Sequence, residues 1–207
     1  MVLPDVPIPL EPPVQRPRLL ASHTFSRVPP QQLGPDAEVA AGCLLLYGRG
    51  EATMHGHGLT PVLRHVLVDT VMEAGGQADD EGFGVFVRQA TPTRYVALRV
   101  SRSGGMVITC FDGDAPEQPL AVGWLHEEIP FDPDGLNRFT VLAAGPSITF
   151  ALNGAVVTGV LVDHRFAEGH AGVLIEQRHA DSTPCLSVRW FQARALLPDP
   201  GGVVGRS

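Results

Sequence analysis

The acidic residues of this 207-residue chain are the first candidates for chemistry. Two carboxylates about 5–5.5 Å apart can act as nucleophile and acid/base on a glycosidic bond. On one strand such a pair needs acids at alternate positions, and the sequence contains neither Glu-x-Asp-x-x-Glu nor Glu-x-Asp-x-Glu. The neighbouring acids in Asp79-Asp80-Glu81 and Glu127-Glu128 point apart on an extended backbone. We assign them to turns and loops and predict no catalytic residue.

The segment 64–73 carries a second set of polar side chains. On a strand, His65, Asp69 and Glu73 share one face, and the alternate positions form an apolar face. Asp69 and Glu73 are four residues apart, which is about 13 Å on a strand and too far for both to act on one bond. We predict a solvent-facing strand surface here and keep Asp69 as a candidate ligand-binding residue.

Metal ligands are the next possibility. His55 and His57 have no third ligand nearby, so we interpret them as part of an exposed loop. Carboxylates at turns supply the hard oxygen ligands that Ca²⁺ prefers, and four such acids occur: Asp112, Asp114, Asp132 and Asp134. Their spacing matches no fixed ligand pattern. The sequence therefore predicts no metal site and no cofactor, with Ca²⁺ as the alternative.

Covalent chemistry has no support in the sequence. There is no G-x-S-x-G elbow, P-loop or dinucleotide fingerprint. Cys43, Cys110 and Cys185 are an odd number without CxxC spacing, so we predict reduced, buried thiols rather than a disulfide framework. Cys110 lies in an apolar strand, where thiols are usually inert.

A recognition surface remains. Arg88, Tyr95 and Arg99 lie on neighbouring predicted strands, and Tyr95 and Arg99 share a face by parity. Trp124 extends this surface if its strand lies alongside. Arginine and aromatic side chains are typical of binding patches. We predict a ligand site of Arg88, Tyr95, Arg99 and Trp124, together with Asp69. The alternative is that the rings are rim or core residues and the arginines lie along the sheet.

These side chains lie on short apolar runs that alternate with period two and are separated by turn residues. This pattern predicts β-strands. The predicted strands are 18–25, 42–47, 64–73, 83–89, 94–101, 105–112, 119–125, 137–144, 147–152, 155–162, 171–178 and 185–195. Asn153-Gly154 is the clearest hairpin turn, since both positions of a two-residue turn favour positive φ. The pattern predicts an all-β fold: a two-sheet antiparallel β-sandwich (jelly roll) of about twelve strands with little helix.

The composition predicts the domain boundaries and argues against nucleic acid and membranes as partners. Residues 1–17 are predicted to form a Pro-rich extended arm, 18–197 the sandwich domain and 198–207 a flexible tail. With 15 Lys+Arg against 22 Asp+Glu and a net charge of −7, nucleic acid is a poor partner. No apolar run reaches the roughly 20 residues that span a bilayer, so we expect no membrane insertion. The amino terminus lacks the features of a signal peptide, and we expect a cytoplasmic protein.

Ten residues carry a family resemblance: Phe86, Arg88, Tyr95, Asn137, Arg138, Asn153, Gly154, Phe166, Gly169 and Gly172. In this order they resemble the bacterial concanavalin A-like jelly rolls, which include laminin G-like modules and domains labelled 3-keto-disaccharide hydrolase. The resemblance covers about residues 18–195. It implies the sandwich fold and leaves the ligand open, because this fold carries lectins, glycosidases and protein-binding modules alike.

Three functions follow from this reading. The first is a non-catalytic recognition module for a protein, a peptide or a glycan, with a peptide or protein slightly favoured by the expected cytoplasmic location. The second is a sugar-acting hydrolase, implied by the resemblance alone. The third is an accessory subunit of a larger assembly that oligomerises through its N-terminal arm.

Overall fold

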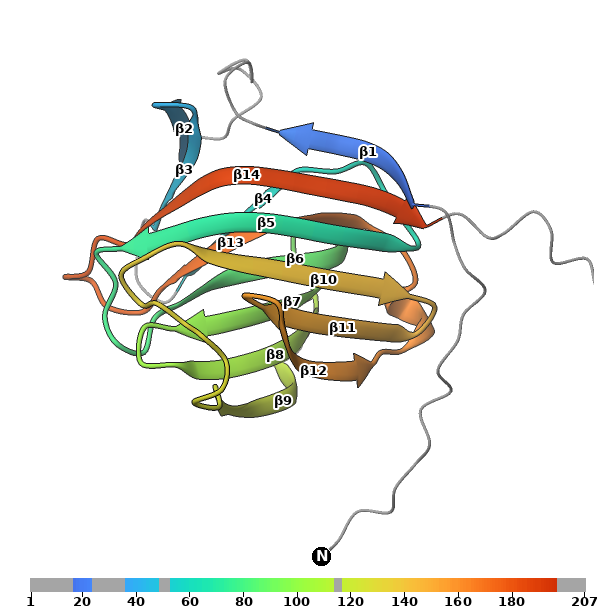
Figure 1. Cartoon of the computed structure of the whole chain (residues 1–207). Helices are drawn as coiled ribbons and strands as arrows, with labels where there is room; N and C mark the ends of the chain where they lie inside the picture. Colours follow the sequence, from blue (N-terminus) through green and yellow to red (C-terminus); the bar gives the residue numbers. More distant parts are fainter. Residues whose placement is uncertain (1–16, 24–35, 49–52, 114–116, 197–207) are drawn as a thin grey trace, which may run out of the picture.

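The computed structural model describes residues 17–23, 36–48, 53–113 and 117–196, and in them the chain is a sandwich of two antiparallel sheets (Figure 1). The eight-stranded sheet has the order β12-β11-β10-β5-β14-β3-β2, and β1 also pairs with β14. Its strands are β1 (Pro17–His23), β2 (Ala37–Ala40), β3 (Cys43–Tyr47), β5 (Val66–Gly75), β10 (Asn137–Ala144), β11 (Ser147–Leu152), β12 (Ala155–Leu161) and β14 (Cys185–Leu196).

The six-stranded sheet has the order β4-β13-β6-β7-β8-β9. Its strands are β4 (Thr53–Gly58), β6 (Gly82–Thr91), β7 (Arg94–Ser101), β8 (Gly105–Asp112), β9 (Gln118–Trp124) and β13 (His170–Gln177). A short 3₁₀ turn, η2 (His164–Phe166), leads into β13. In the described parts of the chain, no helix is long and apolar enough to cross a membrane.

The core lies between the two sheets. In β5 the residues at alternate positions from Val66 to Ala74 are buried, and those between them are half-buried. Phe83 of β6 faces Phe139 of β10 across the core, with ring centroids 5.6 Å apart. This alternation is what a sheet with one buried face requires.

The central strands of the six-stranded sheet differ, because they are buried on both faces. The first seven residues of β6 and six consecutive residues of β7 are buried. Phe86, Tyr95, Ala97 and Leu174 form a second, smaller apolar cluster on the face turned away from the core. The outer face of this sheet is therefore not a plain solvated surface.

The Asn-Gly hairpin is confirmed: β11 and β12 meet at Asn153 and Gly154, whose φ angles are 49° and 87°. Asn137, fully buried at the start of β10, ties this hairpin to the preceding turn. Its Nδ2 donates to the carbonyl oxygens of Asp132 (2.6 Å) and Gly135 (3.1 Å). Its Oδ1 accepts from the amide of Asp132 (3.1 Å) and from Nδ2 of Asn153 (2.9 Å).

The predicted all-β sandwich is confirmed, and two of its strands were missed. The short edge strand β2 has only four residues, and β4 reads Thr-Met-His-Gly-His-Gly, without apolar alternation. His55 and His57 therefore lie in an edge strand paired with β13, and their assignment to a loop was wrong. Residues 1–16 of the predicted arm and the tail 198–207 lie outside the described residues, and Pro17 already begins β1.

Replacing Asn137 with alanine should lower the free energy of unfolding by about 2 kcal/mol, because it removes the hydrogen bonds of a fully buried amide to the backbone of Asp132 and Gly135. Urea unfolding measures this change. Leu136→Ala is the matched control at the adjacent, 51 % exposed side chain, and should cost less than about 0.5 kcal/mol. Equal stabilities of the two variants would show that the asparagine does not secure the turn.

Candidate functional site

The candidate site is the outer face of the six-stranded sheet. Antiparallel pairing places Tyr95 opposite Phe111, Ala97 opposite Thr109 and Arg99 opposite Val107. Because side chains alternate along a strand, Tyr95 and Arg99 share this outer face, as their parity predicts. Glu176 reaches the same face from β13, since it contacts both Arg99 and the backbone of Gly82.

Aromatic rings cover one half of this face. The rings of Tyr95 and Phe111 stack with centroids 4.5 Å apart, and Phe86 packs against Tyr95 at 5.8 Å. Burial raises the pKa of the Tyr95 phenol to about 12. The hydroxyl is therefore neutral at physiological pH. The three packed rings make this half of the outer face apolar.

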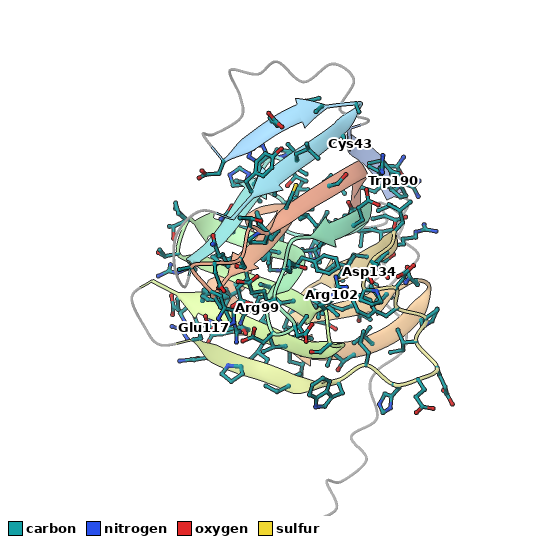
Figure 2. All side chains as sticks on the ribbon, turned by 90° about the vertical axis from the view of Figure 1, so that its left-hand side faces the viewer. Cys43, Arg99, Arg102, Glu117, Asp134 and Trp190 are labelled. Carbon is teal, nitrogen blue, oxygen red and sulfur yellow. The ribbon has the colours of Figure 1, made fainter. Side chains whose placement is uncertain are left out.

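The buried guanidinium of Arg99 occupies the other half of the outer face. The Arg99 guanidinium donates from Nη1 to Oε1 of Glu176 (2.6 Å) and from Nη2 to Oε2 of Glu117 (2.9 Å) and Oγ1 of Thr109 (3.2 Å). Its carbon Cζ lies 5.7 Å from the centre of the Phe111 ring. Figure 2 shows Arg99 and Glu117 side by side on one side of the sandwich. Only 3 % of the Arg99 side chain is exposed, so its charge is paired with these two carboxylates inside the protein, while Nε has no hydrogen-bond partner in the described part of the chain.

A groove of about 250 Å³ runs beside this ion pair between β7, β8 and β9. Its lining includes the buried Arg99 and Glu176 together with Ser101, Ser103 and Trp124. Trp124 is 69 % exposed and lies over Gly105, where an added Cβ would be 3.8 Å from the indole ring. The groove therefore combines a large exposed aromatic plane with fixed hydrogen-bonding groups.

The loop that closes one end of the groove is secured by Glu81. This fully buried carboxylate accepts hydrogen bonds from the amides of Ala78, Arg178 and His179 and from the hydroxyl of Ser182. Burial alone raises the pKa of Glu81, but these four hydrogen bonds outweigh it and the pKa lies below its ordinary value. The fixed loop lets Arg178 donate from Nε to Oε1 of Glu176 at 3.0 Å.

The structure brings Tyr95, Arg99 and Trp124 to this face but not Arg88. The pairing of β6 shifts register after Val87, and Arg88 has a positive φ of 59°. This irregularity turns the Arg88 side chain away from the outer face, and Nη1 donates to the carbonyl of Phe166 at 2.6 Å. Placing Arg88 with the other residues of the site was therefore wrong, because strand parity does not hold across a bulge.

The accessibility predicted for Tyr95 and Arg99 was also wrong, since both side chains are buried. Parity identifies which side chains share a face but not what covers them. Neighbouring rings, Glu176 and Glu117 cover these two.

Asp69 lies on the outer face of the other sheet. Its Oδ1 accepts from Nε of Arg138 at 2.8 Å and from Oγ1 of Thr140 at 3.2 Å. Glu73 on the same strand pairs with Arg189 at 2.7 Å. Asp69 is therefore separated from the groove by the whole sandwich.

Two of the four turn acids that suit Ca²⁺, Asp112 and Asp134, are engaged by arginines. Asp112 accepts from Arg94 at 2.8 Å. Asp134 pairs with Arg102 at 2.6 Å, and Figure 2 shows these two side chains close together. Asp132 accepts from the amide of Asp134 at 3.0 Å, and Asp114 lies outside the described residues. Within the described ranges, no three His, Cys, Asp or Glu side chains are grouped as metal ligands.

Glu176, Ser101 and Arg178 line the groove, and Glu117 pairs with Arg99 beside it. None of these four residues was predicted as part of the site. Parity on the predicted strand 171–178 places Glu176 on one face with Leu174, but the facing partner on β7 depends on the pairing of strands that are distant in sequence. The three cysteines are free; Cys43 and Cys110 are buried as predicted, whereas Cys185 is only partly buried. Burial raises the pKa of Cys110 and Cys185.

This fold is the concanavalin A-like jelly roll. No family model matches the sequence, and no curated protein matches it. Among solved structures, the carbohydrate binding module CBM66 from Bacillus subtilis is similar, with 14% identity and a TM-score of 0.54 over 68% of this chain and 81% of that chain.

Two glucanases are also similar to this chain. The laminarinase catalytic domain from Thermotoga petrophila RKU-1 has 8% identity and a TM-score of 0.63, over 88% of this chain and 99% of that chain. The endo-beta-1,3-glucanase from Pyrococcus furiosus has 9% identity and a TM-score of 0.61, over 89% and 97%. At these identities the likeness establishes the fold alone.

Arg99→Ala should destabilise the protein by about 3 kcal/mol, because it leaves the Glu176 carboxylate buried without its nearest cation. Glu117→Gln should cost less than about 1 kcal/mol, since the Glu117 side chain is half exposed. Guanidinium unfolding at neutral pH compares the two. An Arg99→Ala variant as stable as the wild type would show that this ion pair does not hold the outer face.

Proposed function

We propose that this protein is a non-catalytic carbohydrate-binding module that takes a glycan chain in the groove on the outer face of its six-stranded sheet. The observation that carries the proposal is the exposed Trp124 beside a groove with fixed charged and hydroxyl groups. The similarity to a carbohydrate binding module and to glucanases supports a sugar as the ligand class. This ligand class now takes precedence over a peptide or protein partner.

The chemistry of the groove suits a sugar ring. A sugar presents apolar C–H faces and hydroxyl edges, so it needs an aromatic plane next to hydrogen-bonding groups at fixed positions. Trp124 supplies the plane, and Ser101, Ser103 and Glu176 supply donors and acceptors along the groove. Because the Glu176 carboxylate is already held by Arg99 and Arg178, it loses little conformational entropy on binding.

Hydrolysis is the second candidate, because glucanases share the fold and two carboxylates, Glu117 and Glu176, flank Arg99. A retaining mechanism needs one ionised carboxylate and one protonated acid. Arg99 donates a hydrogen bond to both carboxylates. Because the same guanidinium engages both groups, neither is left free to act on a glycosidic bond, and we favour binding over hydrolysis.

Trp124→Ala should weaken binding of a soluble β-glucan by about thirtyfold or more, since truncating an aromatic anchor residue typically costs about 2 kcal/mol or more. Affinity electrophoresis and calorimetry measure the loss. The control is Trp190→Ala on the opposite sheet, whose indole stacks with Arg138 at 5.9 Å and which Figure 2 shows far from Arg99. Equal affinities of both variants for every glycan bound by the wild type would place the site elsewhere.

Incubation of the wild-type protein with β-1,3-glucan should release no reducing ends above the background. The same assay on Glu117→Gln and Glu176→Gln tests the alternative, because each amide removes one of the two carboxylates beside Arg99. Turnover by the wild type that disappears in either amide variant would establish a hydrolase and reject the binding-module proposal.

A further inference from the structure

Arg88 is a buried cation without a carboxylate partner among the described residues. Its side chain is 1 % exposed. Nη1 donates to the carbonyl of Phe166 and Nη2 to the carbonyl of Gly145, whereas Nε has no partner. A buried charge is costly unless it is paired, and two carbonyl dipoles satisfy only part of a guanidinium with five N–H donors.

The backbone around Arg88 fixes this side chain. Arg88 is held at a φ of 59°, a conformation that is uncommon for a non-glycine residue. Gly169 packs directly against it, and an added Cβ there would be 2.4 Å from the carbonyl carbon of Arg88. The guanidinium is therefore held in place between η2 and the β10–β11 turn, which carries Gly145.

Arg88 lines a cavity of about 190 Å³ at this end of the sandwich. The cavity is equivalent to roughly six water molecules, which is more than a single small ion needs. Arg64, Pro146, Val162, Asp163 and His164 also line it, and none of these residues belongs to the Trp124 groove.

The charge around this cavity is predominantly positive. Arg64 is exposed and forms no ion pair in the described part of the chain, whereas Asp163 is engaged by the amide of Arg165 (2.9 Å) and by His164 (2.7 Å). Burial and the charges of Arg64 and Arg88 lower the pKa of His65. Burial and the charge of Arg64 likewise lower the pKa of Arg88. Arg64 and Arg88 thus both line the cavity, and Asp163, the one acidic side chain in its described lining, is already engaged.

We propose that this cavity is an oxyanion-binding site in which Arg64 and Arg88 hold a sulfate, a phosphate or the carboxylate of an acidic sugar. A planar guanidinium matches the geometry of these groups, and a buried one gains most from the charge because little water competes. The site is separate from the groove and does not depend on its proposed function.

The test is a calorimetric titration of the whole protein with sodium sulfate, sodium phosphate and sodium acetate against sodium chloride at matched ionic strength. We expect saturable binding of at least one oxyanion with a stoichiometry of one. Arg64→Ala should weaken it about tenfold, which corresponds to one charge-assisted hydrogen bond. Arg64→Glu, which places a carboxylate at the site, should abolish it. Acetate binding alone would identify a carboxylate ligand, and sulfate or phosphate binding alone a tetrahedral one.

Arg194→Ala, an exposed arginine on β14, is the control and should leave the titration unchanged. Trp124→Ala should also leave it unchanged, whatever happens to glycan binding. The proposal is wrong if no oxyanion saturates, or if Arg64→Ala and Arg64→Glu bind as the wild type does. A melting temperature that rises without saturation, and equally in all variants, would reflect general salting-out and count against the site.

Discussion

The pairing of the Arg99 guanidinium with Glu176 and Glu117 is the interaction on which the outer face of the six-stranded sheet depends. Strands β6 and β7 are buried on both faces, so a charge placed there must be neutralised inside the protein. Glu176 also accepts hydrogen bonds from the amide of Gly82 and from Arg178. One carboxylate thus connects β13, β6, β7 and the loop held by Glu81, and it gives the groove a fixed base.

The two sheets use arginine differently, although all 15 basic side chains of the chain are arginines. On the eight-stranded sheet, Arg138 and Arg189 lie near the surface and pair with Asp69 and Glu73, where water screens the charges. On the six-stranded sheet, Arg99 and Arg88 are buried. Arg99 meets carboxylates, whereas Arg88 meets carbonyl oxygens. Among the described residues, Arg99 is therefore part of an ion pair, whereas Arg88 is held by carbonyl dipoles alone.

Much of the fold could be predicted from local pattern. The alternation in β5 and β10 and the turn at Asn153-Gly154 identify strands and a hairpin, because side-chain period and positive φ are local properties. The strand β4 could not be found in this way. Its sequence has two glycines and two histidines, and it is a strand because the edge of β13 offers it backbone hydrogen bonds. For the site, parity correctly placed Tyr95 and Arg99 on one face. Arg88 was expected on the same face, but the bulge after Val87 turns its side chain away.

The sequence by itself therefore determined the class of fold, the faces of the regular strands and the absence of a paired-carboxylate motif, since each depends on residues close together in the chain. Only the tertiary structure decided which faces are covered and which charges meet. Glu176 is 77 residues from Arg99, and the Gly145 carbonyl is 57 residues from Arg88. Burial and pairing are properties of distant segments brought together, so Arg99 became part of a buried ion pair, whereas Arg88 meets only carbonyl oxygens among the described residues.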